Sequence, residues 1–315
     1  MENIEYLLSV ALKEKWYRYE RDGHRFYHNR KKVLAGITTI LKEVMPTPIH
    51  LTKWMMENGE EELQRTAEFG SLLHLLILRY MKGEHWWLSI PPGENKEKDL
   101  WKSMIAYRNF EQDYFAGITP YMLEVPLHGK VAGCEYVCTI DFCSPMAITT
   151  FSEVEGEEVY KSGAKKGQKK MVKVSQTKTI NAIVDFKSNY YDKDKSFYQA
   201  QLFQLLAQKE AVFQQTGIKV DKIFNWTPTG FRKDNGHNTY KLVEWVLEGE
   251  ETPKDWSYKT YTKSDVRQFE LYMKLAKERG VNIPRGTITK FLPFLRGEDS
   301  PSTQEISYEN YIKSK

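Results

Sequence analysis

Apolar residues in the N-terminal part of the chain recur with the spacing of helices. Between residues 51 and 80 they lie three and four positions apart, which predicts a helix that breaks at Gly59 and again near Gly70. The part after the second break, "SLLHLLILRYMKG", is expected to open on Ser71 and to close at Gly83. Helices therefore dominate the predicted structure of residues 1 to 120.

Shorter elements flank this helix. The segment "WYRYERDGHRFYHNRKKVLAG" predicts a small hairpin that turns at Asp22-Gly23. The segment "GITTILKEVM" predicts a helix that Thr38 or Thr39 caps and that the prolines of "MPTP" end. A further helix, rich in aromatic residues, is expected from residue 95 to 116.

Strand spacing follows the helical part. Residues 121 to 128 and 131 to 144 predict a hairpin that turns at Gly129-Lys130. Further strands are expected at "AITTFSEVEG", "KTINAIVDFKS", "VDKIFNWTP" and "YKLVEWVL", and further helices at residues 196 to 216 and 262 to 279. The order of helices, strands, helix and strands predicts an α/β fold, in which helices flank a mixed β-sheet.

The size and composition of the chain fit a folded globule. A chain of 315 residues can bury a sizeable core, and we expect one domain over residues 1 to 290 with a tail over residues 291 to 315. No apolar run approaches the roughly 20 residues of a membrane helix, and we expect no membrane partner. The sequence has no N-terminal signal pattern, and its three cysteines cannot all pair, which predicts a cytoplasmic protein.

Residues 161 to 178 hold seven lysines and no acidic residue. A run of this kind is usually a solvated loop, and less often a phosphate-binding one. We interpret residues 152 to 178 as a basic insertion between two strands, and first of all as a loop.

Charged residues interrupt three apolar strands. In "IVDFK", Asp185 and Lys187 share one face of the predicted strand, while Val184 and Phe186 take the other. A buried charge is costly unless it is paired or binds a metal, so the two charges indicate either an ion pair or a site. Acidic residues also stand in "MLEVPL" and "CTIDFC", at Glu124 and Asp141, and such oxygen donors suit Mg²⁺ or Mn²⁺.

These residues carry a family resemblance. "IVDFKS" resembles the D-x-K motif of the PD-(D/E)XK nuclease superfamily, and the closest branch is that of the RecB-like and phage-type exonucleases. The other motifs of this branch occur in the family's order, as Gly70 with His74 in "GSLLH", Glu124, Gly133, Asp141, and Gln201 on the helix after the D-x-K strand. The resemblance implies a restriction-endonuclease-like mixed sheet flanked by helices.

The resemblance also implies a role for each matched residue. Asp141 and Asp185 would ligate a metal, with the carbonyl of Phe186 as a third ligand. Glu124 would bind a second metal or its water, and His74 would contact the metal or the scissile phosphate.

Two further residues complete the implied site. Lys187 would be the catalytic lysine, and Gln201 would steady the site from the following helix. The family usually places a tyrosine four residues after that glutamine, where this chain has Leu205, and Tyr198 is the candidate to replace it.

The implied function is that of a Mg²⁺-dependent (or Mn²⁺-dependent) DNA exonuclease, acting at DNA ends in recombination, repair or phage replication. The expected partners are DNA, a recombination protein and further copies of the chain. The alternative function is a catalytically silent DNA-binding or scaffold protein that keeps the fold. Each site residue also has a purely structural interpretation, namely an Asp185–Lys187 ion pair, a core His74, a solvent-facing Glu124 and a polar helix position at Gln201.

Overall fold

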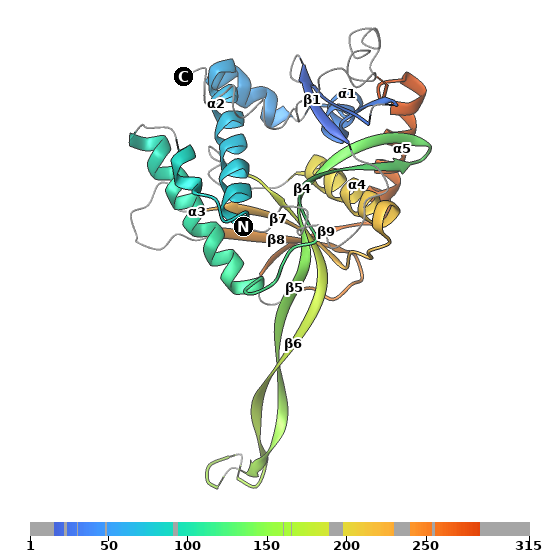
Figure 1. Ribbon diagram of the computed structural model, residues 1–315. Coiled ribbons are helices and arrows are strands. Elements are labelled where there is room, and N and C mark those ends of the chain that lie inside the picture. The colour runs from blue at the N-terminus through green and yellow to red at the C-terminus, as the bar shows by residue number, and fades with distance from the viewer. Residues whose placement is uncertain are drawn as a thin grey trace.

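The computed structural model describes residues 16–21, 24–29, 31–47, 49–90, 94–159, 161–164, 166–188, 198–229, 240–253 and 256–283. Within these residues the chain is mixed α/β, with five α-helices and two β-sheets (Figure 1). The helices are α1 (Ile37–Val44), α2 (Ile49–Met81), α3 (Glu94–Tyr114), α4 (Gln199–Thr216) and α5 (Lys263–Arg279), with a short 3₁₀ helix η2 (Trp86–Ser89). The strands are β1 (Tyr17–Arg21), β2 (His24–His28), β3 (Val33–Ala35), β4 (Met122–Val131), β5 (Cys134–Val159), β6 (Lys169–Phe186), β7 (Lys222–Pro228), β8 (Tyr240–Leu247) and β9 (Ser257–Tyr261).

The larger sheet follows the order of the chain, β4-β5-β6-β7-β8-β9. Neighbouring strands are antiparallel except for β6 with β7 and β8 with β9, which are parallel. The parallel step from β6 to β7 requires a crossover, and helix α4 lies in it. The carboxyl end of β6, which carries Asp185, therefore lies beside β7 in the middle of the sheet.

Helices cover both faces of this sheet (Figure 1). One core layer joins α1, α4 and α5 to the sheet, and the other joins α2, η2 and α3 to its opposite face. In β6, Val184 and Phe186 pack into the layer of α2 and α3, whereas Ile183 packs into that of α1, α4 and α5. Alternation along the strand therefore turns Asp185 toward α4.

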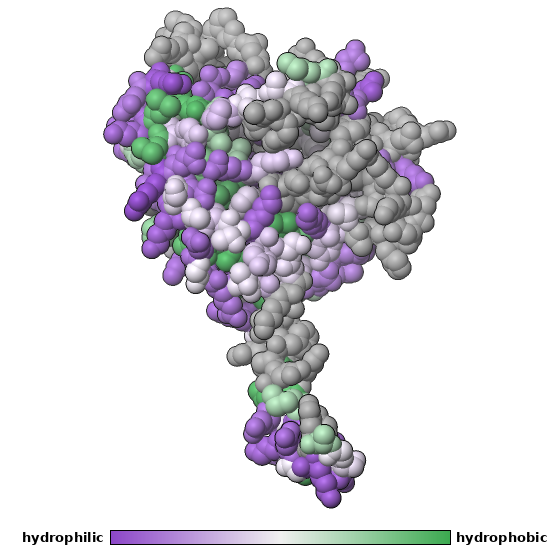
Figure 2. Space-filling model, turned by 180° about the vertical axis from the view of Figure 1, so that it is seen from behind, coloured by the Kyte–Doolittle hydropathy of each residue, from purple (hydrophilic) through white to green (hydrophobic). Residues whose placement is uncertain are grey.

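The predicted insertion forms a long arm. Strands β5 and β6 continue together beyond the sheet and project from the body as a two-stranded ribbon (Figure 1). The loop interpretation is wrong for residues 169 to 178, because they are part of β6. At the far end of the arm Lys170 pairs with Glu158 at 2.8 Å and Lys169 with Glu155 at 3.5 Å. Part of the positive charge of the segment is thus balanced by glutamates of β5, and Figure 2 shows hydrophilic and hydrophobic residues side by side there.

The helix starts and breaks differ in part from those that the sequence predicts. Helix α1 begins at Ile37 with Gly36 as its N-cap, and the hydroxyl of Thr39 accepts a hydrogen bond from the backbone N–H of Arg25 at 2.9 Å instead of capping the helix. Helix α2 has its kink at Gly59, as predicted, but it runs without a break through Gly70. The residues beside Gly70, such as Phe69 and Leu72, are buried in the core. This tertiary packing outweighs the low helix propensity of glycine.

The hairpin of β4 and β5 turns three residues later than predicted. Val131 pairs with Cys134, so the turn is Ala132-Gly133, with φ angles of 49° and 77°. Positive φ at both turn positions matches the right-handed twist of the strands. Gly129 instead lies inside β4, paired with Tyr136, and a Cβ atom at this position would lie 2.5 Å from the side chain of Tyr136.

The sequence pattern does not predict β9, which adds the last strand of the sheet. Among the described residues, no helix combines the length and the apolar character needed to cross a membrane. The predicted tail after residue 290 lies outside the described residues.

Candidate metal centre

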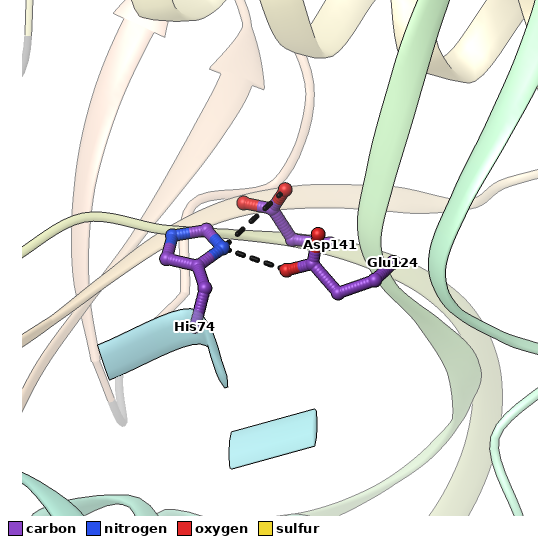
Figure 3. Close-up of side chains that lie close together, drawn as sticks. All are labelled: His74, Glu124 and Asp141. Atoms are coloured by element: carbon purple, nitrogen blue, oxygen red, sulfur yellow. Dashed lines mark hydrogen bonds and ion pairs between the residues drawn. The ribbon is translucent and has the colours of Figure 1, made fainter. Parts of the chain in front are cut away.

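Three elements bring an imidazole and two carboxylates together. His74 comes from α2, Glu124 from β4 and Asp141 from β5 (Figure 3). One ligand atom from each side chain lies within 4.8 Å of the others. Two carboxylates and an imidazole form a donor set that Mg²⁺ or Mn²⁺ accepts, so this cluster is the candidate metal centre.

A local irregularity turns both carboxylates toward His74. Glu124 has a φ of 53°, which is uncommon for a residue other than glycine. Met122 packs into the same core layer as Leu127, although strict alternation would put residues five positions apart on opposite faces, so the alternation of β4 slips by one position at Glu124. The same slip occurs in β5, where Ile140 and Cys143 share a layer on either side of Asp141. Strained backbone of this kind is typical of functional sites.

His74 links the cluster to the end of β6. Its Nδ1 lies 2.7 Å from Oε1 of Glu124 and 3.9 Å from Oδ1 of Asp141, and its Nε2 lies 2.9 Å from the carbonyl oxygen of Phe186. Burial opposes protonation of the ring, but the charges of Asp141 and Glu124 outweigh it and raise the pKa of His74 to about 9. The ring therefore carries two N–H groups at neutral pH and donates to both Glu124 and Phe186.

Asp141 is fixed from its other side by the backbone of β6. Its Oδ2 accepts a hydrogen bond from the N–H of Phe186 at 2.9 Å. Burial raises the pKa of Asp141, while the charge of His74 opposes that rise. The Phe186 backbone thus contacts two members of the cluster, and the phenylalanine ring is buried in the core.

The D-x-K residues lie beside this cluster. Lys187 Nζ donates to Oδ1 of Asp185 at 2.9 Å, on the same side of the strand, as the sequence predicts. Asp185 is completely buried, and burial raises its pKa to about 6 in spite of the charge of Lys187. Lys187 is a quarter exposed and lies close enough to act electrostatically on His74 and Asp141. Asp185 and Lys187 therefore form the ion pair that the sequence offered as one of two interpretations. The same pair lies beside the His74–Glu124–Asp141 cluster.

The structure brings together six of the seven predicted site residues. Glu124 is not a solvent-facing carboxylate, since its side chain is only 9% exposed. Asp185 belongs to the site but not to the compact three-residue cluster, and its two oxygens contact nitrogen donors instead. The carbonyl of Phe186 accepts from His74.

Gln201 is the predicted residue that lies elsewhere. Its Oε1 accepts a hydrogen bond from the backbone N–H of Tyr198 at 2.7 Å, so it closes the capping box at the start of α4. The glutamine that contacts the site is Gln204, whose Nε2 donates to Oδ1 of Asp185 at 2.8 Å. The usual capping signature has Ser or Thr at the N-cap, whereas the N-cap here is Tyr198, so the sequence did not separate the two glutamines.

Two further residues of the site gave no sequence signal. Asn225 of β7 donates from Nδ2 to Oδ2 of Asp185 at 2.7 Å, and Trp245 of β8 donates from Nε1 to Oδ1 of Asn225 at 2.7 Å. Their relation to Asp185 depends on the order of strands in the sheet, which local spacing does not encode.

Together the fold and the site define a mixed α/β protein with a candidate metal centre at the end of a central strand. Searches against family models, curated proteins and solved structures found no match for this chain.

Proposed function

We propose that the protein is a metal-dependent DNA nuclease with a restriction-endonuclease-like core, of the PD-(D/E)XK type. The observation that carries the proposal is the convergence of the His74–Glu124–Asp141 cluster with the Asp185–Lys187 pair at the carboxyl end of β6. Metal-assisted phosphodiester hydrolysis uses a metal to bind the phosphate and a positive charge beside it, and this arrangement would supply both.

The donor set fits a hard divalent cation. Asp141 and Glu124 would hold Mg²⁺ or Mn²⁺, with His74 as a further ligand once its Nδ1 has lost a proton. When bound, such a metal polarises a phosphoryl oxygen and lowers the pKa of a coordinated water. The Phe186 backbone holds Asp141 and His74 in place through its N–H and its carbonyl.

Lys187 is suited to act on the substrate. Its ammonium is held by Asp185 and by Oε1 of Gln204, at 2.9 and 3.3 Å, and the side chain is partly exposed. A fixed, solvent-reachable positive charge would orient the attacking water and stabilise the negative charge that develops on the phosphate. We infer that Lys187 is the catalytic lysine and that Gln204, in place of Gln201, steadies it.

The proposal extends to the substrate and its ends. The resemblance to the RecB-like and phage-type branch supports an exonuclease that acts at DNA ends in recombination, repair or phage replication. A cleavage assay tests this with the purified chain, linear and covalently closed circular DNA, and either Mg²⁺ or a chelator. We expect loss of the linear DNA alone, and only with Mg²⁺. Metal-dependent cutting of both substrates would indicate an endonuclease, and the absence of any cutting would contradict the nuclease proposal.

The two glutamines of α4 give a matched pair of variants. Gln204→Leu is expected to lower kcat about tenfold, because it removes a hydrogen bond that holds Asp185 and one that holds Lys187. Gln201→Leu is expected to leave kcat unchanged and to lower the free energy of unfolding by about 1 kcal/mol, since it removes a helix cap. Steady-state cleavage rates and chemical denaturation measure the two effects. A lower kcat in Gln201→Leu than in Gln204→Leu would show that Gln201, and not Gln204, steadies the site.

A further inference from the structure

Asp185 is buried and accepts hydrogen bonds from a neighbouring strand, from a helix and from Lys187. In the parallel register of β6 and β7 it stands directly beside Asn225, and both side chains are completely buried. Asn225 Nδ2 donates to Oδ2 of Asp185 at 2.7 Å. Trp245, on β8, donates from Nε1 to Oδ1 of Asn225, also at 2.7 Å.

The direction of these hydrogen bonds is fixed by chemistry. An indole N–H can only donate a hydrogen bond. The amide oxygen of Asn225, which is its acceptor group, must therefore face Trp245. The amide nitrogen must then face Asp185, where it can only donate. A flipped amide would set two N–H groups against each other and an amide oxygen against a carboxylate. Trp245 thus determines that the amide nitrogen of Asn225, and not its oxygen, faces Asp185.

The other oxygen of Asp185 faces the site. Its Oδ1 accepts from Lys187 at 2.9 Å and from Gln204 at 2.8 Å. Rotation of the carboxylate would break the hydrogen bond to Asn225 and would move Oδ1 away from the ammonium group. The orientation of Asp185 and the position of Lys187 are therefore linked.

We propose that Asn225, held by Trp245, is a positioning residue that orients Asp185 and thereby places the Lys187 ammonium for attack on the phosphate. This inference rests on the proposed nuclease function. Among the described residues, neither Asn225 nor Trp245 forms a side-chain hydrogen bond with His74, Glu124 or Asp141, so the effect of Asn225 reaches the chemistry through Asp185 and Lys187.

The position of Asn225 in its strand supports a role beyond packing. Ile223, two residues earlier on the same face of β7, is a buried apolar residue of the layer formed with α4. An apolar side chain would fill the position of Asn225 without requiring partners, whereas a buried amide must find a donor and an acceptor. Asn225 has both, in Trp245 and Asp185.

A double-mutant cycle on kcat tests the inference. Trp245→Phe removes only the indole N–H and keeps an aromatic ring, and Asn225→Leu removes the amide at similar volume. Each is expected to lower kcat of Mg²⁺-dependent DNA cleavage about tenfold, with KM within about twofold of the wild-type value, since each breaks the chain of hydrogen bonds from Trp245 through Asn225 to Asp185. In the double variant kcat is expected to equal that of Asn225→Leu alone, because Trp245 acts through Asn225.

Trp226→Phe is the matched control. Trp226 is also a buried tryptophan of the sheet, but its Nε1 has no hydrogen-bond partner among the described residues, so its replacement is expected to leave kcat within about twofold of wild type. Thermal unfolding of all variants identifies any that fail to fold, and Trp245→Phe alone still tests the inference if Asn225→Leu does not fold.

The outcomes separate this inference from the function on which it rests. Unchanged kcat in Trp245→Phe, losses that multiply in the double variant, or an equal loss in Trp226→Phe would overturn the positioning role while the nuclease proposal stands. An inactive wild-type protein would overturn the nuclease proposal and this inference together.

Discussion

Replacement of Lys187 by methionine is expected to lower the rate of Mg²⁺-dependent DNA cleavage about a thousandfold while Mn²⁺ binding is retained. Methionine keeps much of the length of the side chain but removes the charge that would stabilise the developing phosphate charge. Metal binding should persist, because the proposed ligand atoms belong to His74, Glu124 and Asp141. Single-turnover cleavage and calorimetric titration with Mn²⁺ measure the two quantities.

A second lysine provides the control for this variant. Lys222, the first residue of β7, pairs with the buried Glu244, which also accepts a hydrogen bond from Trp256, and strand alternation places Lys222 on the opposite face of the sheet from Asn225. Lys222→Met removes a lysine that is also partly buried and paired, so it is expected to reduce stability without reducing the cleavage rate. Equal rates for Lys187→Met and wild type would rule out a catalytic role for Lys187, and an equal loss in Lys222→Met would assign the effect to stability.

Asp141→Asn is expected to weaken Mn²⁺ binding about a hundredfold and to abolish detectable cleavage. The substitution preserves shape and leaves an amide oxygen to accept from the N–H of Phe186, but it removes the negative charge from the cluster. Thermal stability should not fall, because burial already disfavours the ionised carboxylate and raises its pKa. Calorimetry and gel assays measure binding and cleavage.

Glu135→Gln is the control for the loss of one carboxylate from β5. Glu135 lies outside the cluster and pairs with Lys32 at 2.7 Å, so its replacement is expected to leave both Mn²⁺ affinity and cleavage unchanged. Wild-type affinity in Asp141→Asn would show that the cluster is not the metal site.

The same titrations are expected to depend on pH. The pKa of His74 is about 9, and its Nδ1 must lose a proton before it can ligate a metal. Mn²⁺ affinity should therefore rise with pH up to about 9, with proton release on binding. Affinity independent of pH in the wild type would exclude His74 as a ligand.

Local pattern was sufficient for much of the fold. Most helices and strands lie where the apolar spacing predicts them, including β7, β8 and α5, because burial on one face is recorded directly in the sequence. The prediction was wrong where packing or backbone conformation overrides local preference. Gly70 stays helical within a packed helix, and the β4–β5 turn is at Ala132-Gly133, with positive φ at both residues, while Gly129 lies inside β4 beside Tyr136.

The candidate site divides in the same way. Asp185 and Lys187 could be paired on one strand face from the period of two alone, and His74 could be proposed from its helix motif. The sequence selected Gln201, but the glutamine that contacts Asp185 is Gln204. The two glutamines lie three residues apart on one helix and differ only in what they face. The side chain of Glu124 reaches the cluster from a backbone with positive φ. None of the residues in "MLEVPL" indicates this conformation in the sequence.

By itself the sequence determined that an acidic residue and a lysine share one face of a buried strand, within a mixed α/β chain. Only the tertiary structure decided which donors meet them, since Asn225 and Trp245 reach Asp185 through the order of three adjacent strands. The physical reason is that side-chain spacing encodes which face is buried, whereas hydrogen bonds between distant segments depend on how the strands are paired.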